Sequence, residues 1–458
     1  MTDDRTGPAG LGVGPGHLGA EGLEFVRCQF IDTSGIARGR SVHRDHLPSV
    51  MRRGISFAQI NNLVDIDDAE SDLALGSQAG DFWAVPDPET LVRLPYTRAS
   101  GQMFTDLVGA DGSPWPTCGR ALVRRLTGMV ASDLGRICLG FEQEGYLLRK
   151  REGTYEAVVL GKQMQPEILD LLDGFVSDLT AALAVMRVPM EKITAEGGQG
   201  MLEVNVQHDE PLRAAETYFR LKQAFRGVAR QHELVGTFMP KPFTDGVGAG
   251  LHVHVSCIGP GGEDVFGRGC RGPALSATGR HFLAGLLEHA PALVALGSPT
   301  INSYRRLRPG TWAPTHAAYG VGNRSAMVRI VESRTDLADG AGGRRLELRS
   351  PDGTCNPYFL AGGILAAGLD GVRRQLEPGP PVAADIARLS DSGPAGLDLR
   401  RLPSTLDAAL DGLEADQVLC QLMGPRAIDA YVRVKRIEWD KHMAHVTDWE
   451  HRYYAEFF

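Results

Sequence analysis

The sequence predicts an α+β protein of two domains, a small β-rich domain at the N-terminus and a larger domain of mixed helices and strands. Short strand-like runs broken by turns extend from "FVRCQFIDTSGIARGRSV" to "RLPYTRASGQMFTDLVGADG". Further along, segments with helical apolar spacing alternate with short strands of alternating polarity. The chain has 458 residues and is 43% hydrophobic, which suffices for one large core or two smaller ones.

The N-terminal segment, residues 1–20, is rich in glycine and proline, which predicts a disordered tail. Its Gly-x-Gly-x-Gly run resembles a dinucleotide-binding loop, but no strand precedes it, so we discard that interpretation. We place the β-rich domain at 21–113 and the larger domain at 114–458. The acidic start "MTDDRTGPAG" predicts no signal peptide, and we find no apolar run of about 18 residues that would span a membrane.

The larger domain opens with a helix in which Leu122, Leu126, Met129 and Val130 recur at helical spacing. Further helices are expected at 166–186, 211–234, 279–296 and 356–369. A loop rich in proline and glycine at 376–396 then precedes two closing helices, the first capped at Ser404 or Thr405.

Charge and cysteine content exclude several classes of protein. A net charge of −8 and a pI near 5.9 argue against nucleic acid as a partner, because phosphate binding needs a basic face. Seven cysteines without a Cys-x-x-Cys pair indicate a reduced, cytoplasmic protein.

Four strand-like runs each present polar side chains on one face, because successive residues of a strand point to opposite faces. These residues are His252, His254 and Ser256 in "GLHVHVS", Arg345, Glu347 and Arg349 in "RRLELRS", Glu203, Asn205 and Gln207 in "MLEVNVQ", and Glu142 and Glu144 in "GFEQEGYLL". Glu196 lies just upstream of the third strand, on the glycine-rich turn "EGGQG". For a single strand, a polar face in water is the simpler interpretation. Four such faces rich in Glu, His and Arg indicate a site, because clustered carboxylates repel one another unless a cation lies between them.

Glutamates with one or two histidines and no thiol favour hard divalent ions, Mg²⁺ or Mn²⁺. Nine arginines between 305 and 349 supply groups that bind phosphate or carboxylate through two parallel hydrogen bonds. We expect Arg305, Arg308, Arg334 and Arg344 to pair only with surface acids. No P-loop or kinase motif is present. Metals and arginines together suggest a ligase that activates a carboxylate as an acyl phosphate.

At these motifs the chain resembles the glutamine synthetase family, and in pattern it is most similar to the family's glutamate–amine ligases. The resemblance covers nearly the whole chain, from "IDTSGIARGR" to "VTDWEHRYYAEFF", and is carried by "FEQEGYLL", "FMPKPF" before "GAGLHVHVS", "NSYRRLRPG", "GNRSAMVRI" and "LELRSPDGTCNPY". It implies a β-grasp N-terminal domain and a catalytic domain with a curved antiparallel sheet flanked by helices. It also implies ATP, two or three Mg²⁺ (or Mn²⁺) ions, glutamate and a small amine as ligands, and a homo-oligomer of stacked rings, usually a dodecamer.

The resemblance further implies a role for each matching residue. Glu144, Glu196 and Glu203 match ligands of one metal, and Glu142, His252 and Glu347 match ligands of a second. His254, Ser256, Arg329, Arg345 and Glu191 match the nucleotide site. Arg306 and Arg349 match residues that hold glutamate, Gly248 matches a backbone contact to it, and Arg324, with Arg329, matches residues that neutralise the transferring phosphoryl group.

Trp312 marks the main departure from the family pattern, because ammonia-using members carry at this position a carboxylate that binds ammonium. Removing the carboxylate partner of a buried cation costs roughly 3–5 kcal/mol, whereas a tryptophan face returns only about 0.5–2 kcal/mol. The Asp-Gly-Ser loop of the N-terminal domain is also missing; "AQINNLVDIDD" stands there, and neither Asp65 nor Asp67 can be assigned its role. Met201 replaces a glutamine usual in the family. We therefore predict an ATP-dependent ligase that joins glutamate, or a close analogue, to an amine other than ammonia.

Four competing interpretations remain open at this point. The sole role of Trp312 could be to pack its loop between Pro309 and Pro314, with no part in binding an amine. The enzyme could be an ammonia-using glutamine synthetase with an unusual pocket. It could be a metal-dependent amidohydrolase, since "HVH" on a strand is also a hydrolase motif, or a catalytically silent member of the family.

Overall fold

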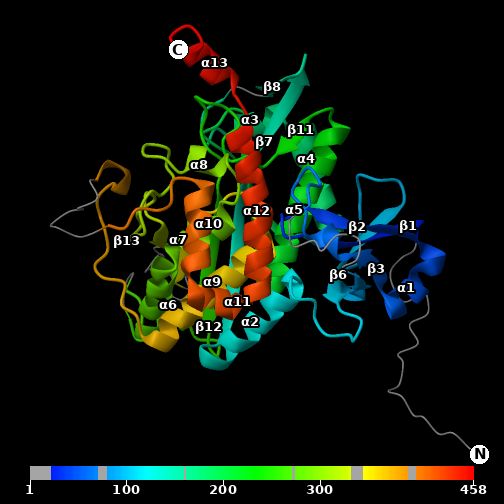
Figure 1. The fold of residues 1–458 in the computed structure, drawn as a ribbon, viewed down its shortest axis with the longest axis horizontal. Coiled ribbons are helices and arrows are strands. Elements are labelled where there is room, and N and C mark those ends of the chain that lie inside the picture. The colour runs from blue at the N-terminus through cyan, green and yellow to red at the C-terminus, as the bar shows by residue number, and fades with distance from the viewer. Residues whose placement is uncertain (1–21, 71–79, 159–160, 271–273, 332–343, 390–398) are drawn as a thin grey trace, which may run out of the picture.

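The computed structural model describes residues 22–70, 80–158, 161–270, 274–331, 344–389 and 399–458. The tail predicted at residues 1–20 lies outside these ranges. Figure 1 shows a smaller β domain formed by the first part of the chain, beside a larger domain of strands and helices. The predicted fold class is confirmed.

The N-terminal domain is built on a six-stranded sheet in the described residues, with the order β2-β1-β6-β4-β3 and β5 paired to β6. Its elements are β1 (Phe25–Ile31), β2 (Ala37–His43), α1 (Leu47–Arg53), β3 (Ile55–Ala58), β4 (Asp81–Pro86), β5 (Val92–Arg93) and β6 (Ser100–Val108). Strands β1 and β6 run parallel, and the other pairs are antiparallel. Phe30, Phe57 and Phe82 pack ring against ring in its core, with centroids 5.2–5.8 Å apart.

The larger domain contains a nine-stranded sheet, again among the described residues, with the order β13-β14-β15-β12-β7-β10-β9; β8 and β11 also pair with β7. Its strands are β7 (Arg136–Arg151), β8 (Thr154–Ala157), β9 (Met190–Ala195), β10 (Met201–Val206), β11 (Val235–Thr237), β12 (Leu251–Ile258), β13 (Tyr319–Val321), β14 (Val328–Val331) and β15 (Arg345–Leu348). The sheet is antiparallel except between β13 and β14. The long strand β7 therefore lies at its centre.

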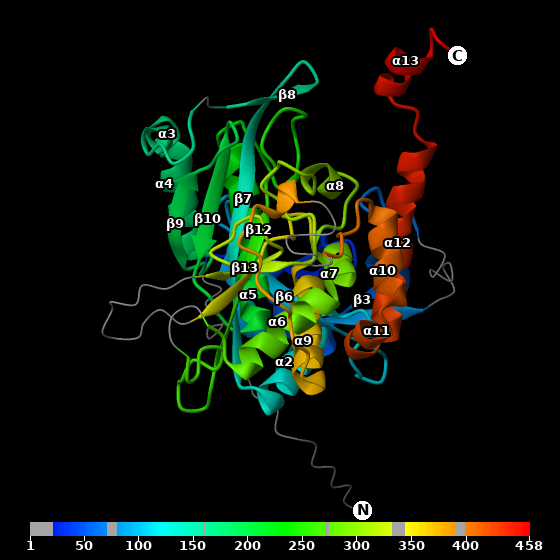
Figure 2. The same cartoon turned by 90° about the vertical axis from the view of Figure 1, so that its left-hand side faces the viewer.

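The helices α2, α5 and α9 pack on the apolar side of this sheet. The helices of this part of the chain are α2 (Gly119–Asp133), α3 (Glu167–Leu171), α4 (Asp173–Val185), α5 (Pro211–Gln231), α6 (Ala277–Glu288), α7 (Ala290–Gly297), α8 (Ser303–Arg306), α9 (Pro357–Arg374), α10 (Leu406–Ala415), α11 (Gln417–Met423), α12 (Pro425–Ala444) and α13 (Asp448–Tyr454). Leu139 and Phe141 of β7 and Val253 of β12 share one core cluster with residues of α2, α5 and α9. Figure 2 shows β7, β9 and β10 on one side of the domain and α10 and α12 on the other. Because the apolar side chains of the strands are used for this core, their polar side chains project from the opposite face.

Several helices are shorter than the sequence predicts. The helix expected at 166–186 is broken at Leu172, where the backbone leaves helical geometry, and gives α3 and α4. The expected helix 279–296 is broken at His289, and proline follows at the second position of α7. Where the sequence predicts two closing helices, the structure has four, α10 to α13. The first of them is capped by Thr405, whose hydroxyl accepts from the Ala408 amide at 3.2 Å.

His289 lies buried at the junction of α6 and α7, between two carboxylates. Its Nδ1 lies 2.6 Å from Asp416 and its Nε2 lies 3.0 Å from Asp370. Burial opposes protonation of the ring, but the two carboxylates outweigh it and raise the pKa of His289. Through these two contacts, the His289 imidazole at the start of α7 is linked to Asp370 of α9 and to Asp416 at the start of α11.

The C-terminal part of the chain extends away from the larger domain, as Figures 1 and 2 show for α13. Lys441 of α12 links this part to the N-terminal domain, because its ammonium lies 2.6 Å from Asp65 and 3.1 Å from Asp67. The other oxygen of Asp65 accepts from the amides of Asp67 and Ala69. In the single chain, these carboxylates therefore hold a loop and a helix together. No helix in the described ranges is long and apolar enough to cross a membrane.

Candidate active site

The pairing of five neighbouring strands collects most of the polar residues that the sequence singled out. Glu142 of β7 stands opposite His252 of β12 and Asn205 of β10. In the same way, Glu203 pairs with Glu144, and Glu347 of β15 pairs with His254 on one side and Arg329 on the other. Because side chains on paired residues point to the same face, one polar surface forms across the sheet.

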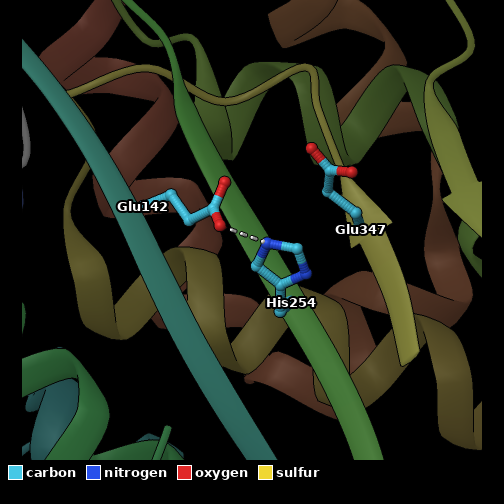
Figure 3. A group of neighbouring side chains, drawn as sticks. All are labelled: Glu142, His254 and Glu347. Atoms are coloured by element: carbon cyan, nitrogen blue, oxygen red, sulfur yellow. Dashed lines mark ion pairs between the residues drawn. The ribbon is translucent and has the colours of Figure 1, made fainter. Parts of the chain in front are cut away.

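Glu142, His254 and Glu347 lie at the centre of this surface, and Figure 3 shows their side chains converging from three strands. The Nε2 atom of His254 lies 3.0 Å from one oxygen of Glu142. Nδ1 of His252 lies 3.7 Å from the other oxygen of Glu142 and 3.5 Å from Glu347. Potential ligand atoms lie within 4.8 Å of one another in two overlapping groups, Glu142–His254–Glu347 and Glu142–Glu203–His252.

Glu144 of β7 and Glu196, which follows β9, lie close enough to Glu203 for their charges to act on it. The Glu144 carboxylate accepts from the Gly250 amide at 2.6 Å, and that of Glu196 accepts from the Gln163 amide nitrogen at 3.0 Å. Burial and the nearby charge of Glu144 raise the pKa of Glu196. Of the six predicted metal ligands, the structure brings Glu142, Glu203, His252 and Glu347 into the two groups, whereas Glu144 and Glu196 belong to neither. Glu203 is grouped with Glu142 and His252 rather than with Glu144 and Glu196, and His254, expected at the nucleotide site, joins Glu142 and Glu347.

The negative charge of this cluster exceeds what its own partners offset. Burial, together with Glu142 and Glu144, raises the pKa of Glu203 to about 8. Glu347 is the opposite case, because the charges of His252 and Arg349 overcome its burial and lower its pKa to about 2. A divalent cation would offset the excess charge, and carboxylate oxygens with one or two imidazoles are suitable ligands for Mg²⁺ or Mn²⁺. The residues present therefore fit a divalent metal.

Arginines surround the cluster on the side of β14 and β15. Arg329 donates to one oxygen of Glu347 at 2.8 Å, and Arg349 pairs with the other. Arg349 also donates through Nε to the Arg324 carbonyl at 3.0 Å, whereas the Arg324 side chain is exposed. Arg345 donates through Nε to Nδ1 of His254 at 3.1 Å. This bond places the imidazole proton on Nε2, the atom that faces Glu142.

Arg306 is buried beside the loop that contains Gly248. Its guanidinium donates to the carbonyls of Ser350 at 2.8 Å and Arg349 at 3.0 Å. A β-carbon at Gly248 would lie 2.8 Å from Cγ of Arg306, closer than real contacts allow, so only glycine fits there. Tyr146 holds the same loop by donating to the Val247 carbonyl at 2.6 Å. Gly248 and Arg306, two of the three residues expected to contact glutamate, therefore lie side by side.

A cavity of about 540 Å³ opens beside the metal-binding cluster. It is lined by four of the five residues expected at the nucleotide site, Glu191, His254, Ser256 and Arg345, together with Glu142. The fifth, Arg329, does not line the cavity, and its guanidinium donates to Glu347 instead. Arg344, expected only to pair with a surface acid, lies 3.6 Å from Asp264 but also lines this cavity.

Several further residues of this site were not predicted from the sequence. Gln163, Tyr146 and Gly250 act through single hydrogen bonds to Glu196, Val247 and Glu144, and such contacts leave no periodic signal in a sequence. Asn205, which also lines the cavity, could have been included, because it shares the polar face of Glu203.

Trp312 lies on the loop that follows α8. Its side chain is 75% exposed, and its backbone adopts a left-handed conformation with φ of 62°. That conformation is unfavourable for a bulky residue. The indole is therefore not packed between Pro309 and Pro314, and the loop presents it to solvent. Thr311 fixes the loop beside it by donating to the carbonyls of Arg306 and Arg308.

The fold and site define a class of enzyme: a two-domain α+β protein whose sheet carries a metal-binding cluster of carboxylates, flanked by arginines and a cavity of nucleotide size. The chain belongs to the glutamine synthetase family. The sequence-family model for the glutamine synthetase catalytic domain matches residues 116–454. The sequence-family model for the glutamine synthetase N-terminal domain matches residues 8–115. It is therefore an ATP-dependent, metal-using carbon–nitrogen ligase that acts on glutamate.

Relatives with two different activities are equally similar to this chain. The glutamine synthetase of Halobacterium salinarum is 32% identical over 449 residues, which cover 96% of this chain and 95% of that protein. The glutamate–methylamine ligase of Methyloversatilis universalis is 32% identical over 454 residues, 95% of this chain and 97% of that protein. A solved structure described as a GmaS/ADP complex superposes with a TM-score of 0.84 at 29% identity, covering 96% of this chain and 99% of that one.

Proposed function

We propose that this enzyme joins the γ-carboxylate of glutamate to an amine other than ammonia and releases a γ-glutamyl amide. The observation that carries the proposal is Trp312, which stands where ammonia-using members of the family carry a carboxylate. An exposed indole offers an amine with carbon substituents both an apolar surface and a cation–π contact. The similarity to a glutamate–methylamine ligase supports the same interpretation.

In the first step, an oxygen of the glutamate γ-carboxylate attacks the terminal phosphorus of ATP, and ADP leaves. We assign Arg306 and Arg349 to holding glutamate, and Gly248 to a backbone contact with it. The guanidinium of Arg349 is oriented by Glu347 and by the Arg324 carbonyl, which leaves its NH2 group for the substrate. Arg324 is exposed and forms no ion pair within the described ranges, so it can turn toward the phosphoryl group as charge develops there.

In the second step, the amine nitrogen attacks the acyl carbon of γ-glutamyl phosphate and the amide bond forms. Phosphate leaves with the electron pair of the broken C–O bond, and the proton that the nitrogen loses ends on the released phosphate. Glu142, His252 and Glu347 would hold one divalent ion, and Glu144, Glu196 and Glu203 another. Bound there, these ions offset the charge of the phosphate oxygens. We assign Glu191, His254, Ser256, Arg345 and Arg329 to binding ATP, because four of them line the cavity beside the cluster.

Phosphate release with ATP, Mg²⁺, glutamate and a panel of amines tests the proposal. We expect methylamine or a larger primary amine to give a higher kcat/KM than ammonium. Trp312→Phe keeps an aromatic surface and is the matched control for Trp312→Ala. Loss of a cation–π contact worth about 0.5–2 kcal/mol lowers kcat/KM for the amine by about 2- to 30-fold in Trp312→Ala. Ammonium as the best substrate of the wild-type enzyme would establish instead an ammonia-using glutamine synthetase.

The amidohydrolase and the catalytically silent protein are separated from a ligase by simple observations. Family membership makes the amidohydrolase interpretation wrong. A catalytically silent protein would neither bind Mg²⁺–ATP nor release phosphate with any amine, whereas we expect both.

We also propose a homo-oligomer of stacked rings in the cytoplasm. Trp449, Tyr453 and Phe457, on and after α13, are exposed in the single chain, and the rings of Trp449 and Tyr453 stack at 4.7 Å. Such an apolar cluster on a projecting helix is typical of a subunit contact. The seven free cysteines fit a reducing compartment. Light scattering should give a mass of many subunits for the full chain and a smaller one after removal of residues 447–458; an unchanged mass would contradict the role of this segment.

A further inference from the structure

A second cavity, of about 620 Å³, lies between the N-terminal domain and the catalytic domain, apart from the active site. The turn between β1 and β2 forms one wall, and α5, α8 and the end of α12 form the others. The cavity has the size of sites for small organic ligands. Phe219, Phe238, Met239 and Ile301 provide apolar surface in it.

Four basic residues line this cavity: Lys222, Arg226, Arg305 and Lys435. Only one carboxylate among its lining residues opposes them, that of Glu438, and this group already accepts from the Ile301 amide at 3.0 Å. Its distance to Lys435 is 3.9 Å, at the outer limit of an ion pair. The positive charge of the cavity is therefore largely uncompensated.

Lys222 shows this imbalance most clearly. Its side chain is buried, and in the described residues its ammonium donates only to the Gly353 carbonyl, at 2.5 Å, with no carboxylate within ion-pair distance. The rings of Tyr218 and Phe238 lie 5.4 and 5.6 Å from it. Burial, with the nearby Arg226, lowers the pKa of Lys222 to about 7. The Asp352 carboxylate favours the ammonium form of Lys222 but lies beyond ion-pair distance, and a bound anion in the cavity would stabilise that form further.

Arg226 and Arg305 are likewise without a carboxylate partner in the part of the chain that the structure describes. Arg226 stacks over Phe238 at 5.4 Å. Arg305 was expected to pair with a surface acid, but its exposed side chain borders the cavity instead. Two guanidinium groups with free hydrogen-bond donors and two buried ammonium groups thus surround one apolar space.

We propose that this interdomain cavity binds a small organic carboxylate, with its hydrocarbon part against Phe219, Met239 and Ile301 and its charge among the basic residues. A purely inorganic anion would leave the apolar walls unfilled, and a neutral apolar molecule would leave Lys222 without a counter-ion. The site is separate from the glutamate and nucleotide residues, so the proposal does not depend on which amine the enzyme uses.

Calorimetric titration of the full-length enzyme with benzoate, cyclohexanecarboxylate and octanoate tests the proposal, with ATP and glutamate present at saturation to block the active site. We expect saturable binding of at least one of them, weaker at high salt, and none of benzamide or inorganic phosphate. Arg305→Gln should raise the dissociation constant about fivefold or more, because it removes one donor near the carboxylate. Arg308→Gln is the matched control, since Arg308 is also exposed on the same segment but does not line the cavity. Lys222→Met should abolish binding.

Three results would overturn the proposal: no saturable binding of any carboxylate, equal binding of benzamide, or equal effects of Arg305→Gln and Arg308→Gln. Binding that appears only after removal of residues 447–458 would overturn it as well. It would indicate that the aromatic C-terminal segment of a second copy occupies the cavity in the intact enzyme.

Discussion

Glu203 should make metal binding by this enzyme strongly dependent on pH. Its pKa is about 8 in the metal-free protein because it is buried beside Glu142 and Glu144. At pH 7 about nine-tenths of the molecules therefore carry a proton on Glu203, and a carboxylate must lose its proton to bind a metal. Metal binding near neutral pH should release that proton.

The size of the effect follows from this pKa. The apparent dissociation constant for Mg²⁺ is multiplied by one plus the ratio of protonated to ionised Glu203. It should therefore fall about tenfold from pH 7 to pH 9, and nearly tenfold from pH 6 to pH 7. In the metal-free protein, Glu203 makes folding stability depend on pH in the opposite direction. Because its pKa in the folded state is raised above the ordinary value, its contribution to the free energy of unfolding is complete below about pH 4.5. That contribution is lost as the pH rises through about 8.

Calorimetry of Mg²⁺ or Mn²⁺ binding in buffers of different ionisation enthalpy measures both quantities. Glu203→Gln should release about one proton fewer than the wild type at pH 7 and lose most of the pH dependence of affinity. Glu191→Gln is the control, because it removes a carboxylate from the neighbouring cavity but not from the metal-binding cluster. Equal affinity of the wild type at pH 7 and pH 9, or equal proton release by Glu203→Gln, would refute the reasoning.

Three further predictions concern the glutamate loop, the metal-binding cluster and the helical core. Gly248→Ala should raise the KM for glutamate about tenfold and leave that for ATP nearly unchanged in steady-state assays, because its β-carbon would displace Arg306 at a cost of about 1–3 kcal/mol. Glu347→Gln frees the two arginines that it orients and should lower kcat/KM at least about 100-fold; a loss below about threefold would contradict its role. His289→Gln should cost about 3 kcal/mol in urea unfolding at pH 6, since it removes the cation between Asp370 and Asp416, of which Asp370 keeps a second partner in Arg374. Because the folded pKa of His289 is raised, its contribution is complete below about pH 6.5 and is lost as the pH rises through the folded value, so the deficit of the variant should be smaller at pH 9.

The alternation of polar and apolar residues was sufficient to predict the faces of the active-site strands. His252 and His254, with Glu142 and Glu347, lie on one surface as expected, because a strand has only two faces and the core takes the apolar one. Alternation could not give the pairing of the strands. The grouping of Glu203 with Glu142 and His252 depends on strand order, which is set by residues distant in sequence.

Features that join distant segments could not be predicted from the sequence. The helix breaks at Leu172 and His289 are different, because Gly174 and Pro291 follow them closely and are local signals that the prediction of continuous helices overlooked. The interdomain cavity combines Lys222 with Lys435, more than two hundred residues apart, and neither belongs to a motif. A residue pattern within one segment of the chain cannot indicate a site that several distant segments form together.

The position of Trp312 outside the sheet has a consequence for how such enzymes diversify. Strand β7 is hydrogen-bonded on both sides, so a change at Glu142 disturbs several strands at once. The loop of Trp312 has no partner strand among the described residues, and its tip faces solvent. With the role proposed for Trp312, acceptor choice changes by substitution in this loop while the residues that handle phosphate stay constant, and grafting the loop between homologues tests that role directly.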